Sequence, residues 1–180
     1  MEKLKQNLKL AMKYMVKKFY RFELSVERFS GTKDVLPVVV SERLIDVKQN
    51  YTGEMMEIQG QFRSFNKHEE NHSKLILFVF AREIKFAEEG TYHTNNILLD
   101  GFICKPPVYR KTPSGREIAD ILLAVNRPHG ISDYIPCICW EEMPDILAVA
   151  KLEITFFCKE EYRAENTQKK LKLRLKKNGL

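Results

Sequence analysis

The feature that most constrains the fold of this chain is an internal repeat with a constant offset of 99 residues. The segment Phe22-Glu-Leu-Ser-Val-Glu-Arg28 matches Ile121-Leu-Leu-Ala-Val-Asn-Arg127, and Asp34-Val-Leu-Pro-Val-Val-Val40 matches Asp133-Tyr-Ile-Pro-Cys-Ile-Cys139. Two matches with one offset indicate a duplicated structural unit rather than coincidence. Because 180 residues can hold two small domains, the sequence predicts two halves that share a fold.

The repeated segments are typical of β-strands, because they alternate or run apolar over strand length between Gly, Pro and Asp residues. We predict first-half strands over residues 19–28, 34–41, 54–65 and 74–86, and second-half strands over 97–104, 118–126 and 134–140. Gly60, inside an alternating strand, indicates a bulge or a corner of a small closed barrel. Pro106 and Pro107 are expected to bend the chain after the first of the second-half strands.

The two ends of the chain differ from its middle in charge. The formal net charge is +6, yet residues 1–18 and 159–180 each carry +5 and residues 19–158 carry −4. Residues 1–18 are interpreted as a Lys-rich helix, because their apolar side chains fall at helical spacing. Residues 141–180 are interpreted as an amphipathic helix, a short apolar run and a basic helix or disordered end, with a linker over 87–94.

Three motifs in the second half occur in a specific order. They are Asn95-Asn-Ile-Leu-Leu-Asp-Gly101, the turn Arg110-Lys-Thr-Pro-Ser-Gly115, and Leu123-Ala-Val-Asn-Arg127. Together they resemble bacterial single-stranded DNA-binding proteins of the SSB family, in a clostridial type with two OB-fold halves. The resemblance implies a mainly β chain, with a degenerate OB unit over residues 19–86. It implies a second OB unit over 95–140 that is incomplete after its third strand, and ends that do not follow the family.

The ends suggest a frame-shift hypothesis. In a frame shifted by one base, codons for residues 140–146 can spell Gly-Arg-Asn-Ala-Arg-Tyr, which the resembled family has after its Trp. Residues 151–154, 159–166 and 12–16 likewise permit family-like stretches. Residues 1 to about 17 and 141–180 would then be out-of-frame translations, and their basic character accidental. A genuine divergent tail is the alternative, and the reading frame of the gene decides between them.

The candidate site residues are those that could stack on bases or neutralise phosphates. The resemblance implies stacking by Trp140, Tyr134 and His129, and strand alternation places Tyr134 and Trp140 on one face, opposite Cys137 and Cys139. The candidate phosphate ligands are Arg110, Lys111, Arg116 and Arg127. Each could instead be a barrel-wall, loop or solvated surface residue.

The first half lacks these aromatic residues at the repeat positions. The offset places Ser30, Val35 and Ser41 opposite His129, Tyr134 and Trp140, so this half is interpreted as a structural or self-association module. Phe62 and Phe65 lie in a predicted strand and could stack on bases, although a core position is the simpler interpretation.

No catalytic or metal-binding constellation stands out. Cys137 and Cys139 alternate on a strand without a second ligand pair, so they are interpreted as buried thiols in a reducing cytoplasm. His68, His72 and His93 lie in polar segments without acid or Cys partners at ligand spacing. We therefore expect no enzyme activity, no cofactor and no metal. No segment approaches the length of a membrane helix, and none has the apolar core of a signal peptide.

The sequence thus favours a cytoplasmic, nucleoid-associated and oligomeric protein that binds single-stranded DNA without sequence specificity. The resemblance implies roles in replication, recombination and repair. The acidic C-terminal tip through which SSB proteins recruit partners is absent, which leaves contacts with replication and repair proteins open. The alternatives are an OB-fold protein-interaction module and a degraded product without function.

Overall fold

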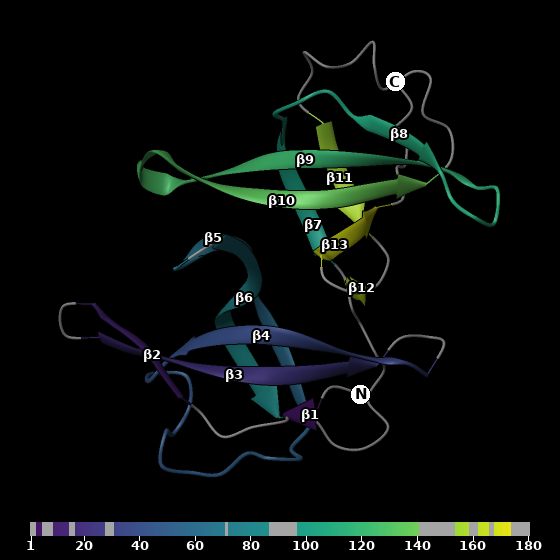
Figure 1. Ribbon diagram of the computed structural model, residues 1–180. Coiled ribbons are helices and arrows are strands. Elements are labelled where there is room, and N and C mark those ends of the chain that lie inside the picture. The colour runs from purple at the N-terminus through teal and green to yellow at the C-terminus, as the bar shows by residue number, and fades with distance from the viewer. Residues whose placement is uncertain are drawn as a thin grey trace. The chain divides into compact units, whose positions relative to one another are not determined.

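A computed structural model describes residues 3–4, 9–14, 17–27, 31–70, 72–86, 97–140, 154–158, 162–165 and 168–173. The chain divides into two units (Figure 1). Unit 1 consists of Met1–Arg63 and Leu75–Thr94, and unit 2 of Ser64–Lys74 and Asn95–Leu180. Unit 2 therefore includes a short segment, Ser64–Lys74, that precedes the rest of it in the sequence by twenty residues.

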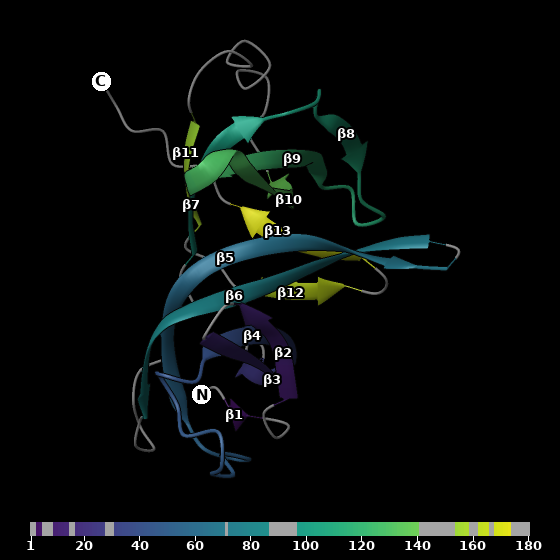
Figure 2. The ribbon, with the colours of Figure 1, turned by 90° about the vertical axis from the view of Figure 1, so that its left-hand side faces the viewer.

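Unit 1 is built on one six-stranded sheet. Its strands are β1 (Lys3–Leu4), β2 (Lys9–Tyr14), β3 (Lys17–Glu27), β4 (Lys33–Ser41), β5 (Met56–Glu69) and β6 (His72–Phe86). The order is β1-β3-β4-β6-β5, with β2 also paired to β3. β3 and β4 are antiparallel, whereas β4 and β6 are parallel. β5 and β6 form a long curved hairpin (Figure 2), whose Ser64–Lys74 tip belongs to unit 2.

Unit 2 is built on a seven-stranded sheet. Its strands are β7 (Ile97–Ile103), β8 (Val108–Lys111), β9 (Glu117–Arg127), β10 (Ile131–Trp140), β11 (Ile154–Cys158), β12 (Tyr162–Glu165) and β13 (Gln168–Leu173). The order is β11-β7-β9-β10-β13-β12, with β8 also paired to β9. A single 3-10 turn, η1 (Pro128–Gly130), joins β9 to β10.

The internal repeat is confirmed by strand register. In unit 1, Val26 pairs with Asp34 across the β3–β4 ladder. In unit 2, Val125 pairs with Asp133 across the β9–β10 ladder. Both residues of the second pair lie 99 positions after those of the first, and the same relation holds along both ladders. The two units thus share the geometry of their second and third long strands, as the predicted duplication requires.

The repeat extends into the strand that follows. In unit 1, Val38 pairs with Val79 across the parallel β4–β6 ladder. In unit 2, Cys137, the repeat equivalent of Val38, pairs with Leu171 across the parallel β10–β13 ladder. Each unit therefore adds a parallel strand at the same place, as five-stranded OB barrels do. The mainly β, two-OB architecture is confirmed.

The interpretation that the second OB unit stops after its third strand is wrong. β11 pairs with β7 at one edge of the sheet, and β13 pairs with β10 at the other. Backbone pairing of both edges satisfies N–H and C=O groups that an open three-stranded sheet would leave unpaired. The frame-shift hypothesis is a statement about the gene and stays a prediction.

Three further expectations about the ends have different outcomes. The helix over residues 1–18 is wrong where the chain is described, because β1, β2 and the start of β3 are strands. Pairing with β3 outweighs the weak helical spacing of the apolar residues. The basic helix or disordered end is likewise wrong over β12 and β13, which are strands, and the short apolar run contains the strand β11. The amphipathic helix over residues 143–153 and the linker over 87–94 lie outside the described residues, and the domain boundaries stay a prediction.

The core of each unit comes from the inward positions of the repeated ladders, which alternate as strands that bury one face do. These positions are Phe22, Leu24, Val26, Leu36, Val38 and Val40 in unit 1, and Ala119, Ile121, Leu123, Ile135, Cys137 and Cys139 in unit 2. Gly60 and Gly101 allow close backbone crossings. A Cβ at Gly101 would lie 2.7 Å from the carbonyl oxygen of Ala124, and one at Gly60 would overlap the carbonyl oxygen of Phe80.

Candidate nucleic-acid interface

The outer face of the unit 2 sheet carries two exposed aromatic rings in one cross-strand row. Phe102 of β7 pairs with Ala124 of β9, and Ala124 pairs with Tyr134 of β10. Directly paired residues point to the same face of a sheet. Phe102 is 47% exposed and Tyr134 48% exposed, and the small Ala124 side chain lies between them. We call Phe102, Ala124 and Tyr134 the aromatic row.

The opposite face of β10 is buried. Asp133, Ile135, Cys137 and Cys139 point inward, and each is at most 1% exposed. The prediction that Tyr134 lies on the face opposite Cys137 and Cys139 is therefore confirmed. On the outer face of β10, solvent exposure falls toward the end of the strand, where Ile138 is only 4% exposed.

Trp140 ends β10, with its backbone paired to Ile118. Its side chain lies outside the described part of the structure. The prediction that Trp140 stacks on bases therefore stays a prediction, supported by its position on the Tyr134 side of the strand alternation.

The predicted basic turn is a hairpin between β8 and β9. Gly115 has φ of +82°, the left-handed region that favours glycine. The backbone N–H of Thr112 donates to the Arg116 carbonyl oxygen at 2.8 Å, and the Arg116 N–H donates to Thr112 Oγ1 at 3.0 Å. These bonds hold exposed Arg116 at the base of the turn.

Two of the predicted phosphate ligands on this hairpin pair with neighbouring carboxylates. Arg110 Nε lies 2.8 Å from Asp120 Oδ2, on the outer face of the sheet. Lys111 Nζ lies 3.7 Å from Glu117 Oε1, and both of these side chains are more than half exposed. The exposed Lys111 pair is weak, so Lys111 can exchange its partner for a phosphate at small cost, whereas Arg110 holds the partly buried Asp120 through two hydrogen bonds.

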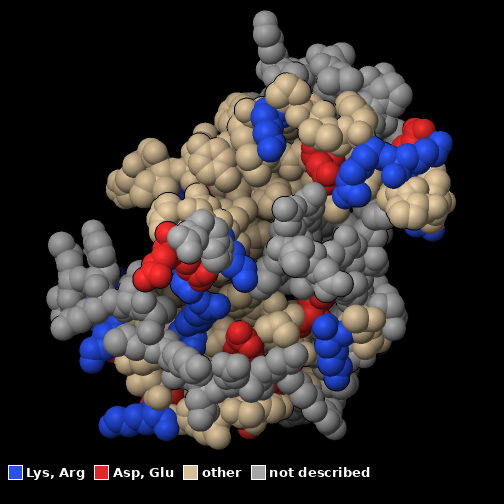
Figure 3. All heavy atoms as spheres, in the orientation of Figure 1, with Lys and Arg blue, Asp and Glu red and all other residues tan. Residues whose placement is uncertain are grey.

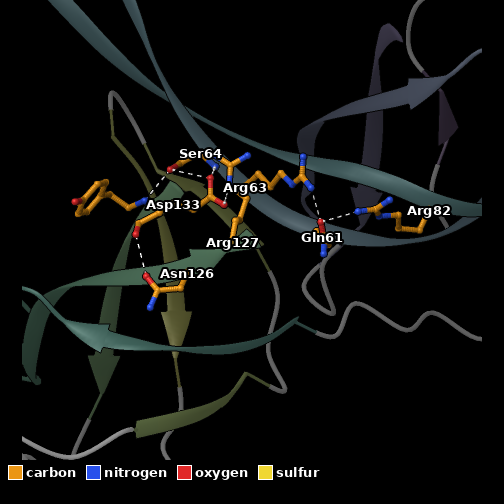
Figure 4. A network of polar contacts seen from close by, with 9 residues as sticks. Gln61, Arg63, Ser64, Arg82, Asn126, Arg127 and Asp133 are labelled. Atoms are coloured by element: carbon orange, nitrogen blue, oxygen red, sulfur yellow. Dashed lines mark hydrogen bonds and ion pairs between the residues drawn. The ribbon is translucent and has the colours of Figure 1, made fainter. Parts of the chain in front are cut away.

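Arg127 has a different environment. Its Nε lies 2.9 Å from Oδ2 of Asp133, which is 1% exposed. The other carboxylate oxygen of Asp133 accepts the backbone N–H of Ser64 at 2.7 Å, and Ser64 Oγ accepts the N–H of Tyr134 at 2.8 Å (Figure 4). We call Ser64, Arg127 and Asp133 the Asp133 network of unit 2. Because Asp133 engages its guanidinium, phosphate binding by Arg127 stays a prediction, with a positioning role as its alternative.

His129 lies at the apex of the β9–β10 hairpin. It is exposed and has φ of +70°, an uncommon value for a residue with a side chain. Gly130 follows with φ of +69°, and Ser132 Oγ donates to Asn126 Oδ1 at 2.9 Å near the base of the turn. The turn thus presents the His129 ring at the surface, and its predicted contact with a base stays a prediction.

Sequence reasoning did not name Phe102 and Tyr109, two exposed aromatic residues of unit 2, and it favoured a core position for Phe65. Phe102 follows Gly101 in the first motif, and alternation with buried Leu99 would have placed it outward. Phe65, in the hairpin tip, is 43% exposed, so the interpretation of Phe65 as a core residue is wrong. Its alternation partner Ser64 takes the inward position instead, because the hairpin tip belongs to unit 2, a relation that the sequence does not indicate.

The hairpin tip also carries charged and polar pairs. Lys67 Nζ lies 2.8 Å from Glu69 Oε1, and this hydrogen bond and charge lower the pKa of the Glu69 carboxyl. His68 Nδ1 lies 2.8 Å from Ser73 Oγ.

On the face that Figure 3 draws, Lys and Arg side chains are interspersed with acidic ones rather than gathered in one basic patch.

Searches for other kinds of site give no candidate among the described residues. No group of three or more His, Cys, Asp or Glu side chains is placed to hold a metal ion. Within the same residues, no helix has the length and apolar character needed to cross a membrane.

Comparison with known proteins identifies the architecture. No protein-family model matches the chain, and no curated protein matches it. The wild-type single-stranded DNA-binding protein from Thermus aquaticus superimposes with a TM-score of 0.66 and 18% identity, over 95% of this chain and 86% of that one. A deletion mutant of that protein gives 0.67 and 16%, over 95% and 87%.

A third solved structure covers only part of this chain. The dimeric N-terminal domain of the PriB protein from Thermoanaerobacter tencongensis is 40% identical over 48% of this chain and 90% of that one, with a TM-score of 0.41. These two superpositions show the fold: the chain is SSB-like, and its fold resembles that of the single-stranded DNA-binding protein of Thermus aquaticus.

Proposed function

We propose that the outer face of unit 2 binds single-stranded DNA without sequence specificity and without chemistry. The observation that carries this proposal is the aromatic row, in which Phe102 and Tyr134 expose about half of their surface on either side of Ala124. Aromatic side chains that form one contiguous exposed surface on a sheet mark an interaction site more strongly than isolated exposed side chains do. Bases stack on aromatic side chains regardless of their identity, at about 1–3 kcal/mol per base.

The placement of the row supports this proposal. OB-folds bind oligonucleotides on the face of their second and third strands and with neighbouring loops. The second and third long strands of unit 2 are β9 and β10, and the row crosses both. Arg116 in the β8–β9 turn and His129 in the β9–β10 turn are both exposed, at opposite ends of β9. Trp140 shares the strand alternation of Tyr134, but buried Ile138 lies between them on that face, so its proposed stacking is separate from the aromatic row.

The wider role follows from the fold by analogy. The matched Thermus aquaticus protein is a single-stranded DNA-binding protein. We propose that this chain likewise covers exposed strands in replication, recombination and repair, in the cytoplasm and associated with the nucleoid. We further propose that it acts as a homo-oligomer. Recruitment of replication and repair proteins belongs to the same proposal.

The test is a titration of fluorescein-labelled oligo-dT with the full chain at two salt concentrations, followed by anisotropy. Saturable binding that weakens with salt is expected, since phosphate contacts release counterions. Tyr134→Ala and Phe102→Ala should each weaken binding by about 5- to 100-fold. The matched control is Val35→Ala, the repeat position of Tyr134 in unit 1, which should leave affinity unchanged.

Two results would overturn the proposal. One is the absence of saturable binding by a chain whose circular dichroism shows a folded β protein, which would favour the protein-interaction module. The other is equal affinity of wild type and both aromatic variants, which would place any DNA contact elsewhere on the chain.

A further inference from the structure

The edge of β10 beside Tyr134 is occupied by a residue from the first half of the chain. The Tyr134 N–H donates to Ser64 Oγ at 2.8 Å (Figure 4), and Ser64 begins the Ser64–Lys74 tip that belongs to unit 2. Among the described residues, the strand that pairs with β10 opposite β9 is β13, and it does so only over Cys137–Cys139. At Tyr134, Ser64 therefore takes the place of a ladder partner.

A set of buried contacts holds Ser64 in this place. The Ser64 N–H donates to Asp133 Oδ1 at 2.7 Å, and the Ser64 hydroxyl lies 3.5 Å from the same oxygen. Arg127 Nε lies 2.9 Å from Asp133 Oδ2, which orients the carboxylate. Ser64 is 8% exposed and Asp133 1% exposed, and a hydrogen bond is stronger in such surroundings than in water. The Ser64 hydroxyl is thus a fixed acceptor for the Tyr134 backbone.

The Tyr134 backbone determines how its ring is presented. On one side Tyr134 pairs with Ala124 of β9, and on the other side it is bound by Ser64. Side chains of a strand stand roughly perpendicular to the sheet, in rotamers that depend on the backbone dihedral angles. Ser64 therefore controls the direction of a ring that is 48% exposed, although its own buried side chain offers no surface to a base.

Order at Tyr134 before binding affects the affinity for a base. A side chain that is ordered only when the ligand arrives loses affinity to the entropy of ordering, whereas a preorganised side chain does not. Without the Ser64 hydroxyl, the Tyr134 N–H would lose its acceptor, and the start of β10 would be held less firmly on this edge. The Tyr134 ring would then sample more directions before it stacks.

We propose that Ser64 is a positioning residue for the aromatic row, and that its hydroxyl holds the Tyr134 backbone so that the ring is ready to stack on a base. This role rests on the proposed function of unit 2. Ser64 contacts no nucleic acid itself and acts only through Tyr134. The site in the second half of the sequence thus depends on a residue from the first half, a dependence that the 99-residue repeat does not predict.

The test measures oligo-dT binding by the full chain with anisotropy, in a cycle of Ser64→Ala, Tyr134→Ala and the double variant. Ser64→Ala should weaken binding about 3- to 10-fold, the cost of ordering one side chain on binding. Its salt slope should stay that of the wild type, because no phosphate contact is lost. Added to Tyr134→Ala, Ser64→Ala should weaken binding less than about 1.5-fold further, since it has no ring left to position.

A matched pair of substitutions isolates the hydroxyl. Ser64→Thr and Ser64→Val have nearly the same shape, but only Ser64→Thr keeps an oxygen that accepts the Tyr134 N–H. Ser64→Thr should bind at least about threefold more tightly than Ser64→Val. Ser73→Ala removes a hydroxyl from the same hairpin tip, where it lies 2.8 Å from His68 Nδ1, and should leave the affinity for oligo-dT unchanged.

Amide hydrogen exchange reports on the contact in the absence of DNA. The Tyr134 N–H should exchange more slowly in the wild type and in Ser64→Thr than in Ser64→Ala and Ser64→Val, because local opening is easier once the hydrogen bond is lost. Thermal unfolding shows which variants are folded at the assay temperature. If Ser64→Ala unfolds there, the comparison of Ser64→Thr with Ser64→Val decides.

The outcomes separate this role of Ser64 from the proposed function. Weaker binding by Ser64→Ala only where Tyr134 is present, with recovery in Ser64→Thr, supports the role. Equal weakening with and without Tyr134 overturns it, because Ser64 would then stabilise unit 2 as a whole. Wild-type affinity in Ser64→Ala also overturns it, however fast the Tyr134 N–H exchanges, and neither result affects the proposed function. If Tyr134→Ala has no effect, the role is overturned, and the proposed function is overturned too only if Phe102→Ala also has none.

Discussion

The β3–β4 ladder of unit 1 and the β9–β10 ladder of unit 2 are the same structure built from different residues. Both keep a buried aspartate at the start of the third long strand, Asp34 at 4% and Asp133 at 1% exposure. Both turn through a glycine with positive φ, Gly31 at +77° and Gly130 at +69°. The turn and the inward residues therefore set the register in both units.

The outward positions of the two ladders differ in chemistry. Unit 2 has Tyr134 where unit 1 has Val35, whereas unit 1 has Arg21 where unit 2 has Asp120. These side chains contribute little to the core, so they can change without loss of the fold. Equivalent faces of the duplicated units thus carry different chemical groups on the same backbone.

The largest expected effect on stability comes from the Asp133 network of unit 2. Asp133→Ala should lower the free energy of unfolding by about 3 kcal/mol, because Arg127 and the Ser64 N–H lose a buried acceptor. Urea unfolding measures the change. The control is Asp120→Ala, which removes a partly exposed partner of Arg110 and should cost less than about 1 kcal/mol. Equal costs would mean that burial of Asp133 has no energetic consequence.

The second effect concerns the two close backbone crossings, one in each unit. Gly60→Ala and Gly101→Ala should each cost about 2 kcal/mol, because the added Cβ overlaps a carbonyl oxygen of the neighbouring strand. Gly60→Ala should cost more, since its contact is closer. The control is Gly53→Ala, which has no atom within 4 Å of the new Cβ but does have φ of +89°. If Gly53→Ala costs as much as Gly60→Ala, backbone conformation rather than strand crossing explains the loss.

The sequence predicts the repeated part of the fold because the pattern there is local. Period-two alternation and turn residues mark β3, β4, β9 and β10, and a constant offset relates them. The local sequence does not indicate strands β11 and β13, because each forms by pairing with a strand more than thirty residues earlier. β11 pairs with β7, and β13 pairs with β10. A Lys-rich strand has helical propensity by itself, and only its partner decides otherwise.

The candidate site shows the same difference between positions set by local sequence and contacts set by distant segments. Tyr134 could be placed outward from the alternation of one strand, and the structure confirms that placement. The contacts of Phe80 with Arg63 and Phe19 could not be predicted, because these residues come from three strands and meet only after the sheet has formed. Likewise, nothing in the local sequence of Arg127 indicates a buried carboxylate partner six residues later.

A smaller effect on stability concerns the β9–β10 turn, where His129 precedes Gly130, the repeat equivalent of Gly31. His129→Gly should raise the free energy of unfolding by up to about 1 kcal/mol, because a side chain at φ of +70° is strained and glycine is not. Thermal unfolding measures this change. The same variant should weaken oligo-dT binding if His129 contacts a base. A His129→Asn variant, which tolerates positive φ, separates strain from contact; unchanged stability in both variants would show that the turn stores no strain.

The smallest expected effect on stability comes from Lys111. Its ion pair with Glu117 is long, at 3.7 Å, and both side chains are highly exposed, so Lys111→Gln should change the free energy of unfolding by less than about 0.5 kcal/mol. If Lys111 contacts a phosphate, the same substitution should lower the magnitude of the salt slope of oligo-dT binding by about 0.7. Glu117→Gln is the matched control, since it breaks the same pair but leaves the cation, and it should preserve or slightly strengthen binding. An unchanged slope in Lys111→Gln would remove Lys111 from the DNA path, and the outer face of unit 2 would then bind mainly through its rings.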